Sequence, residues 1–141
     1  MPNINGIRRE LVEHMRKIKP GVIVRAEFIA PRVAFANPRD NKPADFWGLS
    51  GSASLNGKML TITAVNPDAK NARETDININ GARIMSGQAR VLSSNDIHAH
   101  NSFANPKGLE PRDEAITVGE GGQLVYKFAP ASVTRLQLTL A

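Results

Sequence analysis

The stretch Ser132-Val-Thr-Arg-Leu-Gln-Leu-Thr-Leu140 decides the fold of this chain. Leucine occupies every second position from 136 to 140, and polar residues stand between the leucines. Successive side chains of a strand point to opposite faces, so this spacing places the leucines on one face and the polar residues on the other. The pattern predicts a half-buried strand of an antiparallel sheet, with a core on one side and water on the other.

The same kind of pattern recurs along the sequence between turn residues. The run Thr75–Asn80 alternates through Ile77 and Ile79, and Asn56-Gly57 forms a two-residue hairpin signal between two β-prone runs. Strands are predicted over residues 22–29, 32–36, 46–55, 58–65, 74–80, 83–92, 115–118, 122–128 and 132–140. Short strands at this spacing predict an all-β fold, a two-sheet antiparallel sandwich with jelly-roll or Greek-key wiring.

The N-terminal end has a different period. Ile7, Leu11, Met15 and Ile18 recur at helical spacing, and Pro20-Gly21 ends the segment. This predicts one α-helix over residues 6–19. We therefore divide the chain into an N-terminal helical arm, 1–22, and a β-sandwich domain, 23–141.

Composition narrows the classes of function. The chain has 141 residues, no cysteine and a net charge of +5. The excess charge lies in residues 1–42, which carry nine Lys/Arg against four acidic residues, with no aromatic side chains among the basic residues of the predicted helix. Surfaces that bind nucleic acids combine basic side chains with aromatic side chains on which bases stack. We therefore expect no nucleic-acid partner. No apolar run is long enough to span a membrane and no leader is apparent, so we expect a cytoplasmic protein without a membrane partner.

The longest irregular segment covers residues 93–113, a length that is typical of functional loops. Asp96, His98 and His100 alternate there and would share one face of an extended chain, where they could bind a metal. The alternative, which we favour, is that Asp96, Asn101 and Asn105 bond backbone groups of the loop, so no metal or other cofactor is expected.

Two large amphipathic aromatic residues, Trp47 and Tyr126, raise the question of sugar binding. Exposed aromatic rings supply apolar area with a polar edge, which suits stacking on a sugar. Trp47 lies between Phe46 and Leu49 in a predicted strand, which favours a place in the core or an interface. Trp47 is kept as a candidate sugar contact, beside Asp96, His98, His100, Asn101 and Glu110 of the loop.

Several of these segments, taken in order, carry a resemblance. They are Trp47-Gly-Leu-Ser-Gly-Ser-Ala-Ser-Leu55, Leu60-Thr-Ile-Thr-Ala-Val-Asn-Pro67, Asp96-Ile-His-Ala-His-Asn-Ser-Phe-Ala-Asn-Pro-Lys-Gly-Leu-Glu-Pro111 and Phe128-Ala-Pro-Ala-Ser-Val-Thr-Arg-Leu136. Their order and spacing resemble the C-terminal β-sandwich of the α-L-arabinofuranosidases of glycoside hydrolase family 51. The resemblance runs from about Arg25 to Leu140. Residues 5–23 are similar to an early helix and strand of the catalytic barrel that accompanies this sandwich.

The resemblance implies a fold without the family's catalytic centre. A (β/α)₈ barrel needs at least about 200 residues, more than this chain holds in total. In the family the acid/base glutamate follows an asparagine, and no Asn-Glu dipeptide occurs here. Glu110, Asp113 and Glu114 are close in sequence, but their polar surroundings do not favour the raised pKa of a catalytic acid.

Three hypotheses follow for function. The first is a non-catalytic accessory sandwich, associated with the hydrolysis of arabinose-containing plant polysaccharides. The second is a minimal glycoside hydrolase that uses other carboxylates, and the third is a carbohydrate-binding module. The apolar stripe of the predicted helix needs a surface to cover. We therefore expect a homo-oligomer or a catalytic partner chain, with a polysaccharide as a further partner.

Overall fold

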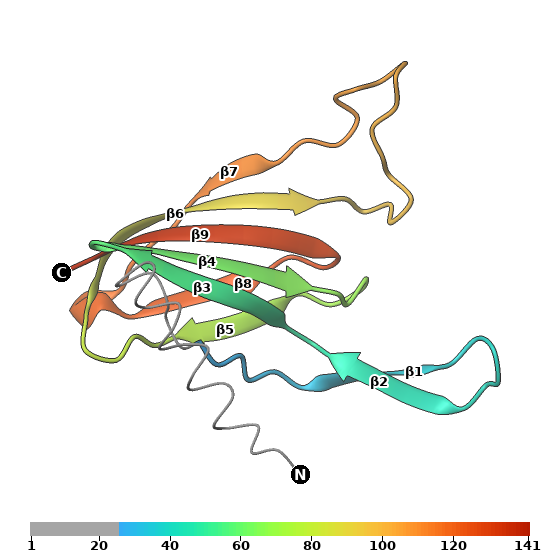
Figure 1. Cartoon of the computed structure of the whole chain (residues 1–141), viewed down its shortest axis with the longest axis horizontal. Helices are drawn as coiled ribbons and strands as arrows, with labels where there is room; N and C mark the ends of the chain where they lie inside the picture. Colours follow the sequence, from blue (N-terminus) through green and yellow to red (C-terminus); the bar gives the residue numbers. More distant parts are fainter. Residues whose placement is uncertain (1–25) are drawn as a thin grey trace, which may run out of the picture.

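The computed structural model describes residues 26–141, which form strands, turns and one 3₁₀ turn, with no α-helix among them (Figure 1). The all-β class predicted from the sequence is confirmed. The predicted helix over residues 6–19, and the arm of residues 1–22 to which it belongs, lie outside the described residues. The elements are β1 (Arg32–Ala36), β2 (Pro43–Trp47), β3 (Ser50–Asn56), β4 (Met59–Asn66), β5 (Arg73–Ile77), β6 (Ile84–Ser93), β7 (Arg112–Ala115), η1 (Glu120–Gly122), β8 (Leu124–Phe128) and β9 (Ser132–Leu140).

The strands form three antiparallel sheets. The largest has five strands in the order β3-β4-β9-β6-β7, and the pairs β5-β8 and β1-β2 form two smaller sheets. The last strand, β9, lies between β4 and β6 and pairs along its whole length with both (Figure 1). Its bounds, 132–140, are those that the leucine alternation predicted. Because β9 has a partner on each side, the two ladders satisfy most of its backbone groups, and the Leu140 backbone N donates to the Lys58 carbonyl oxygen (2.8 Å) beyond the β4 pairing.

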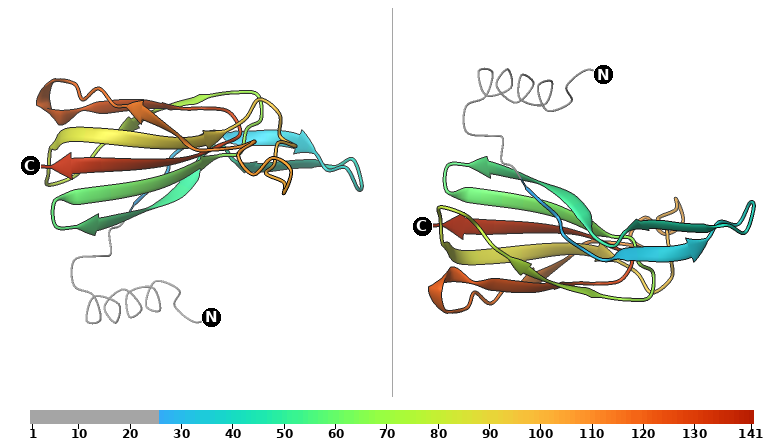
Figure 2. Two further views of the ribbon diagram at one scale, coloured as in Figure 1. Left: turned by 90° about the horizontal axis from the view of Figure 1, so that it is seen from above. Right: turned by 90° about the horizontal axis from the view of Figure 1, so that it is seen from below.

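The β5-β8 sheet lies against one face of the five-stranded sheet (Figure 2). The core fills the space between them, where Leu136 and Leu138 of β9 are fully buried beside Leu124 and Phe128 of β8. Tyr126, the middle residue of β8, is buried there too, and its ring meets that of Phe128 edge-on with centroids 4.9 Å apart. The jelly-roll or Greek-key wiring of this two-layer arrangement stays a prediction.

Four predicted strands differ from the structure by three residues or more. The strand expected over 74–80 ends at Ile77. The strand expected over 46–55 is interrupted between β2 and β3, where the Gly48 backbone N donates to the Pro31 carbonyl oxygen (3.0 Å) and the Leu49 side chain enters the core. A Cβ atom at Gly48 would lie 2.3 Å from that oxygen, so only glycine allows this approach.

The strand expected over 115–118 is instead β7, because residues 112–115 pair with β6. Of the strand expected over 22–29, the described residues 26–29 are extended but belong to no sheet. Among residues 26–141 no helix is long and apolar enough to cross a membrane.

Candidate functional site

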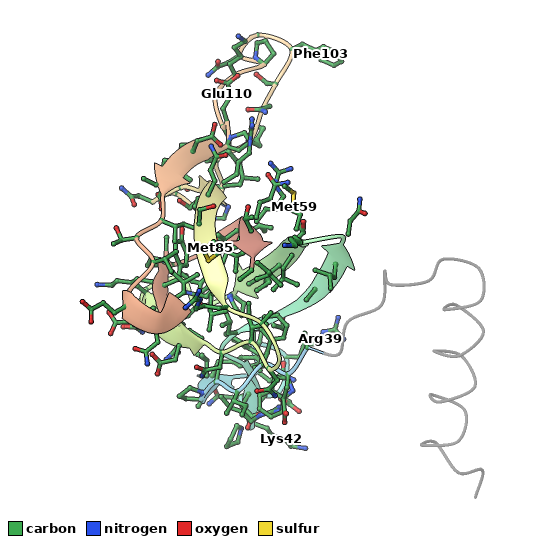
Figure 3. The ribbon with its side chains drawn as sticks, turned by 90° about the vertical axis from the view of Figure 1, so that its left-hand side faces the viewer. Arg39, Lys42, Met59, Met85, Phe103 and Glu110 are labelled. Atoms are coloured by element: carbon green, nitrogen blue, oxygen red, sulfur yellow. The ribbon has the colours of Figure 1, made fainter. Side chains whose placement is uncertain are left out.

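Two projections leave the same end of the sandwich, the β1-β2 hairpin and the segment 94–111 that joins β6 to β7 (Figure 1). Seen along the long axis, they lie on opposite sides of the molecule, with Phe103 in the segment and Arg39 and Lys42 at the tip of the hairpin (Figure 3). We call the segment 94–111 the long loop. It contains all the sequence-predicted site residues except Trp47.

Trp47 lies at the end of β2 in the hairpin, and its side chain is 56% exposed. Of the two places expected for Trp47, the core is therefore wrong, because β2 pairs only with β1 and neither strand joins the main sheets, while a place in an interface stays a prediction. The Arg32 guanidinium lies 4.5 Å from the ring centroid and is itself bound to Asp45. One ring face thus already has a cation on it, and a sugar would have to stack on the other.

The first part of the long loop is a series of short-range turns. The backbone N of Asp96 donates to Ser94 Oγ (3.1 Å), and the backbone N of His98 donates to Asp96 Oδ1 (2.9 Å). Nδ1 of His100 lies 2.8 Å from the carbonyl oxygen of His98. The three candidate metal ligands therefore lie in turns instead of sharing one face of an extended strand. No cluster of three metal-binding side chains occurs among residues 26–141.

Asn101 ties the two sides of the long loop together. Its Nδ2 donates to the Leu109 carbonyl oxygen (3.0 Å), and its Oδ1 accepts from the Leu109 backbone N (2.6 Å). The Asn101 amide thus bonds both backbone groups of Leu109, as a residue of a paired strand would, and these bonds lie within the long loop. The long loop projects away from the sandwich (Figure 1). The side chain of Phe103 is fully exposed in the loop (Figure 3).

The three acidic residues that are close in sequence face different partners. Glu110 lies 4.0 Å from Lys107 in the long loop, and Asp113 lies 3.8 Å from Arg90.

Glu114 accepts hydrogen bonds from Arg112 Nε (3.1 Å) and from the hydroxyl of Tyr126 (3.0 Å). Burial, followed by the bond to Glu114, raises the pKa of Tyr126 to about 12. The three carboxylates therefore have separate partners, and Asp113 and Glu114, as successive residues of β7, point to opposite faces of the sheet.

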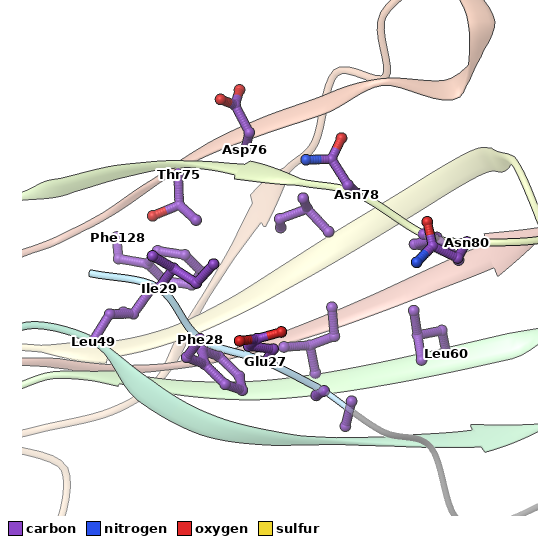
Figure 4. Close-up of a pocket in the computed structure, with 15 residues that line it drawn as sticks. Glu27, Phe28, Ile29, Leu49, Leu60, Thr75, Asp76, Asn78, Asn80 and Phe128 are labelled. Atoms are coloured by element: carbon purple, nitrogen blue, oxygen red, sulfur yellow. The ribbon is translucent and has the colours of Figure 1, made fainter.

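A cavity of about 700 Å³ opens between β5 and the β3-β4 pair (Figure 4). The five-stranded sheet has more strands than the β5-β8 sheet, and residues 26–29 line the cavity beside β3, β4 and β5. Apolar side chains such as Phe28, Leu60 and Phe128 line it. Its two acidic residues do not form a pair, because Glu27 is exposed and Asp76 points away from the cavity (Figure 4). No sequence pattern indicates this cavity, since it depends on how the two sheets and residues 26–29 pack together.

A buried polar corner joins the end of β4 to the β8-β9 turn, and sequence reasoning missed it. Asn66 is 1% exposed. Its Nδ2 lies 2.9 Å from the carbonyl oxygens of Asn71 and Ala129 and 3.3 Å from that of Phe128, and its Oδ1 accepts from the Asp68 backbone N (3.1 Å). An Asn-Pro dipeptide such as Asn66-Pro67 indicates a turn and no more than that.

Asp68 extends this corner toward β5. Its carboxylate accepts from the backbone N atoms of Lys70 (2.9 Å) and Asn71 (3.1 Å), from the Asn71 side chain (3.1 Å) and from Arg73 Nη2 (2.9 Å). The bond from the Lys70 backbone, then that from the Asn71 side chain, holds the pKa of Asp68 below its usual value. Asn66 and Asp68 bond mainly to backbone groups, so the corner fixes the fold and is not a reaction site.

The family model described as the α-L-arabinofuranosidase C-terminal domain matches residues 11–132 of this chain. The chain belongs to this family. The α-L-arabinofuranosidase C-terminal domain is thus the fold that residues 26–141 display, and the resemblance drawn from the quoted motifs is confirmed. No curated protein sequence matches the chain.

Solved structures agree with this assignment. The glycoside hydrolase family 51 arabinofuranosidase from Xanthomonas axonopodis pv. citri is similar over 77% of this chain and 21% of its own, with a TM-score of 0.65 and 18% identity. The family 51 α-L-arabinofuranosidase from Bifidobacterium longum is similar over 78% of this chain and 21% of its own (TM-score 0.64, 17% identity). The thermostable family 51 α-L-arabinofuranosidase from Thermotoga petrophila RKU-1 is similar over 80% of this chain and 24% of its own, with a TM-score of 0.59 and 23% identity. The chain thus spans less than a quarter of these enzymes, and the likeness is one of fold.

Proposed function

We propose that this chain is a non-catalytic accessory domain of an α-L-arabinofuranosidase, acting beside a catalytic domain in the hydrolysis of arabinose-containing plant polysaccharides. The match of the C-terminal domain family over residues 11–132 carries the proposal. The chemistry of the described residues supports it, because the acidic side chains of the long loop, β7 and the cavity have separate partners or directions. A glycosidase needs two carboxyl groups that flank one bond of the substrate.

The accessory role is tested by incubating the purified chain with an aryl α-L-arabinofuranoside. The expected result is no release of the aryl group above a buffer control. The alternative, a minimal glycoside hydrolase with re-purposed carboxylates, requires turnover that Glu110→Gln or Asp96→Asn removes while the circular dichroism spectrum stays unchanged. Turnover with that pattern would replace the accessory role by the enzymatic one.

We further propose that the cavity between β5 and β3-β4 is covered in the working protein. Its lining begins at Ala26, the first described residue, and includes apolar side chains such as Phe28, Leu60 and Phe128. The apolar stripe predicted for residues 6–19 is the nearest cover along the chain, and a second copy or a catalytic partner chain is the alternative.

Light scattering after size exclusion distinguishes these covers. A monomer whose cavity binds an apolar fluorescent dye only after deletion of residues 1–22 supports the chain's own segment. A dimer that dissociates on the same deletion supports a homo-oligomer. A monomer that binds the dye with or without residues 1–22 would contradict cover by the chain's own segment and by a second copy, and would leave a catalytic partner chain as the cover.

The carbohydrate-binding alternative rests on Trp47, which is exposed on the β1-β2 hairpin. If Trp47 stacks on a sugar, Trp47→Ala abolishes retardation of the chain in gels that contain arabinan or xylan. Phe35→Ala is the matched control, because Phe35 is another exposed aromatic residue of the same hairpin.

A further inference from the structure

The outer face of the five-stranded sheet, turned away from the core, carries two arginines side by side. Arg90 of β6 and Arg135 of β9 are direct partners in the antiparallel register, and both are exposed. Their strand neighbours Ala89 and Leu136 are fully buried, which places the arginines on the opposite, outer face. The register continues this row across the sheet through Ser52, Thr63, Arg135, Arg90 and Asp113.

Like charges directly opposite each other destabilise a sheet. The carboxylate of Asp113 lies 3.8 Å from Arg90 Nη1 and partly offsets the positive charge of the pair. Both side chains are about half exposed, so this ion pair contributes little to stability. Among residues 26–141 no carboxylate lies within 4.0 Å of Arg135. The outer face therefore carries two adjacent guanidinium groups whose positive charge is largely not neutralised by neighbouring carboxylates.

Of the two rows beside the arginines on this face, one is apolar, with Val65, Val133 and Leu92, and the other is uncharged and polar. The register sets Ser54, Thr61, Gln137 and Gln88 side by side across four strands. With strands about 4.8 Å apart, the five strands offer a surface about 19 Å wide. Hydroxyl, amide and guanidinium groups thus occupy its centre. The core of a protein–protein interface is instead depleted of charged residues and rich in aromatic ones.

We propose that this face binds a polysaccharide that bears uronic-acid carboxylates, with Arg135 and Arg90 holding the carboxylate and the Ser/Thr/Gln row meeting the sugar hydroxyls. The planar guanidinium matches a carboxylate in two parallel hydrogen bonds, which makes arginine pairs suited to this group. The site is separate from Trp47 and from the long loop, and it goes beyond the accessory role. An acidic surface of a partner protein is the competing occupant.

Affinity electrophoresis of the full chain tests the proposal. Glucuronoxylan, which carries carboxylates, is the probe, and neutral arabinoxylan is the comparison. Retardation by glucuronoxylan that weakens with added salt is expected, because exposed charges are screened. Arg135→Gln should weaken binding about tenfold, the effect of one lost charged hydrogen-bonding group. Arg39→Gln removes the same charge from the distant hairpin tip and should leave binding unchanged.

A gain of binding provides a test that misfolding cannot imitate. Asp113→Asn removes the carboxylate beside Arg90, which repels an acidic polymer, and should tighten binding of glucuronoxylan severalfold. Equal retardation by the acidic and neutral polymers, or equal losses for Arg135→Gln and Arg39→Gln, would overturn the proposal. So would no retardation by glucuronoxylan, the outcome expected if the face meets only an acidic protein surface. The furanoside assay is independent, so failure here and failure of the accessory role are distinguishable.

Discussion

Replacing Asn66 by alanine tests whether the buried polar corner holds the two layers together. The amide has two N–H groups and three carbonyl oxygens within reach, so two full bonds form at 2.9 Å and the contact at 3.3 Å is a weak third. Its oxygen accepts one more bond, from the Asp68 backbone. Three lost bonds at about 1 kcal/mol each, with a buried carbonyl left without this partner, give a loss of about 3–4 kcal/mol in the free energy of unfolding.

Urea unfolding followed by far-UV circular dichroism measures this loss. With an m-value of about 2 kcal/mol/M, the midpoint should fall by about 1.5–2 M while the m-value stays the same. Asn66→Asp keeps the shape but removes both donated bonds, so it should be at least as destabilising as Asn66→Ala. Asn78→Ala is the control, because the Asn78 side chain is exposed and points away from the cavity, and it should change stability by less than about 0.5 kcal/mol (Figure 4). A loss below about 1 kcal/mol in Asn66→Ala, or a wild-type midpoint in Asn66→Asp, would refute the reasoning.

Three further predictions concern the core and two titrations. Leu138 is fully buried, so Leu138→Ala should cost about 2–5 kcal/mol in the same urea assay, while exposed Thr139→Ala should cost little. The pKa of Asp68 is lowered by folding, so its contribution is present above its ordinary pKa of 3.8 and is lost as the pH falls through the folded value. Acid titration of stability should therefore be shallower in Asp68→Asn than in the wild type. The pKa of Tyr126 is raised to about 12 from 10.0, so its contribution is present below pH 10 and is lost as the pH rises toward 12. Ultraviolet titration should show that Glu114→Gln lowers this pKa but leaves it above 10.0, because burial is the larger cause.

The strands with alternating sequences were predictable, and those set by tertiary contacts were not. β9 was predicted to the residue because its leucines alternate and one side of it faces the core. The break between β2 and β3 follows from the approach of Gly48 to Pro31, two residues far apart in the pattern, so no local signal marks it. β7 contains three charged residues in a row and is a strand only because β6 pairs with it.

The candidate site was predictable only where a side chain bonds to the backbone of its own loop. The loop-holding role of Asn101 follows from a short amide side chain in a long loop, and the two bonds to Leu109 have that form. Trp47 was misplaced because its apolar neighbours suggest a core, whereas the β1-β2 hairpin stands apart from the main sheets. The Arg90–Arg135 pair depends on the register of β6 against β9, which the sequence does not determine.

Release of arabinose from arabinoxylan is the most direct test of the central claim, that this chain carries the side domain of an arabinofuranosidase without a catalytic site of its own. The purified 141-residue chain is incubated with the polymer, and free arabinose is quantified by chromatography beside a buffer blank and a preparation from cells that lack the expression plasmid. The account predicts arabinose at the level of the two blanks. Arabinose released in proportion to the amount of chain, and lost when the chain is unfolded, would contradict it.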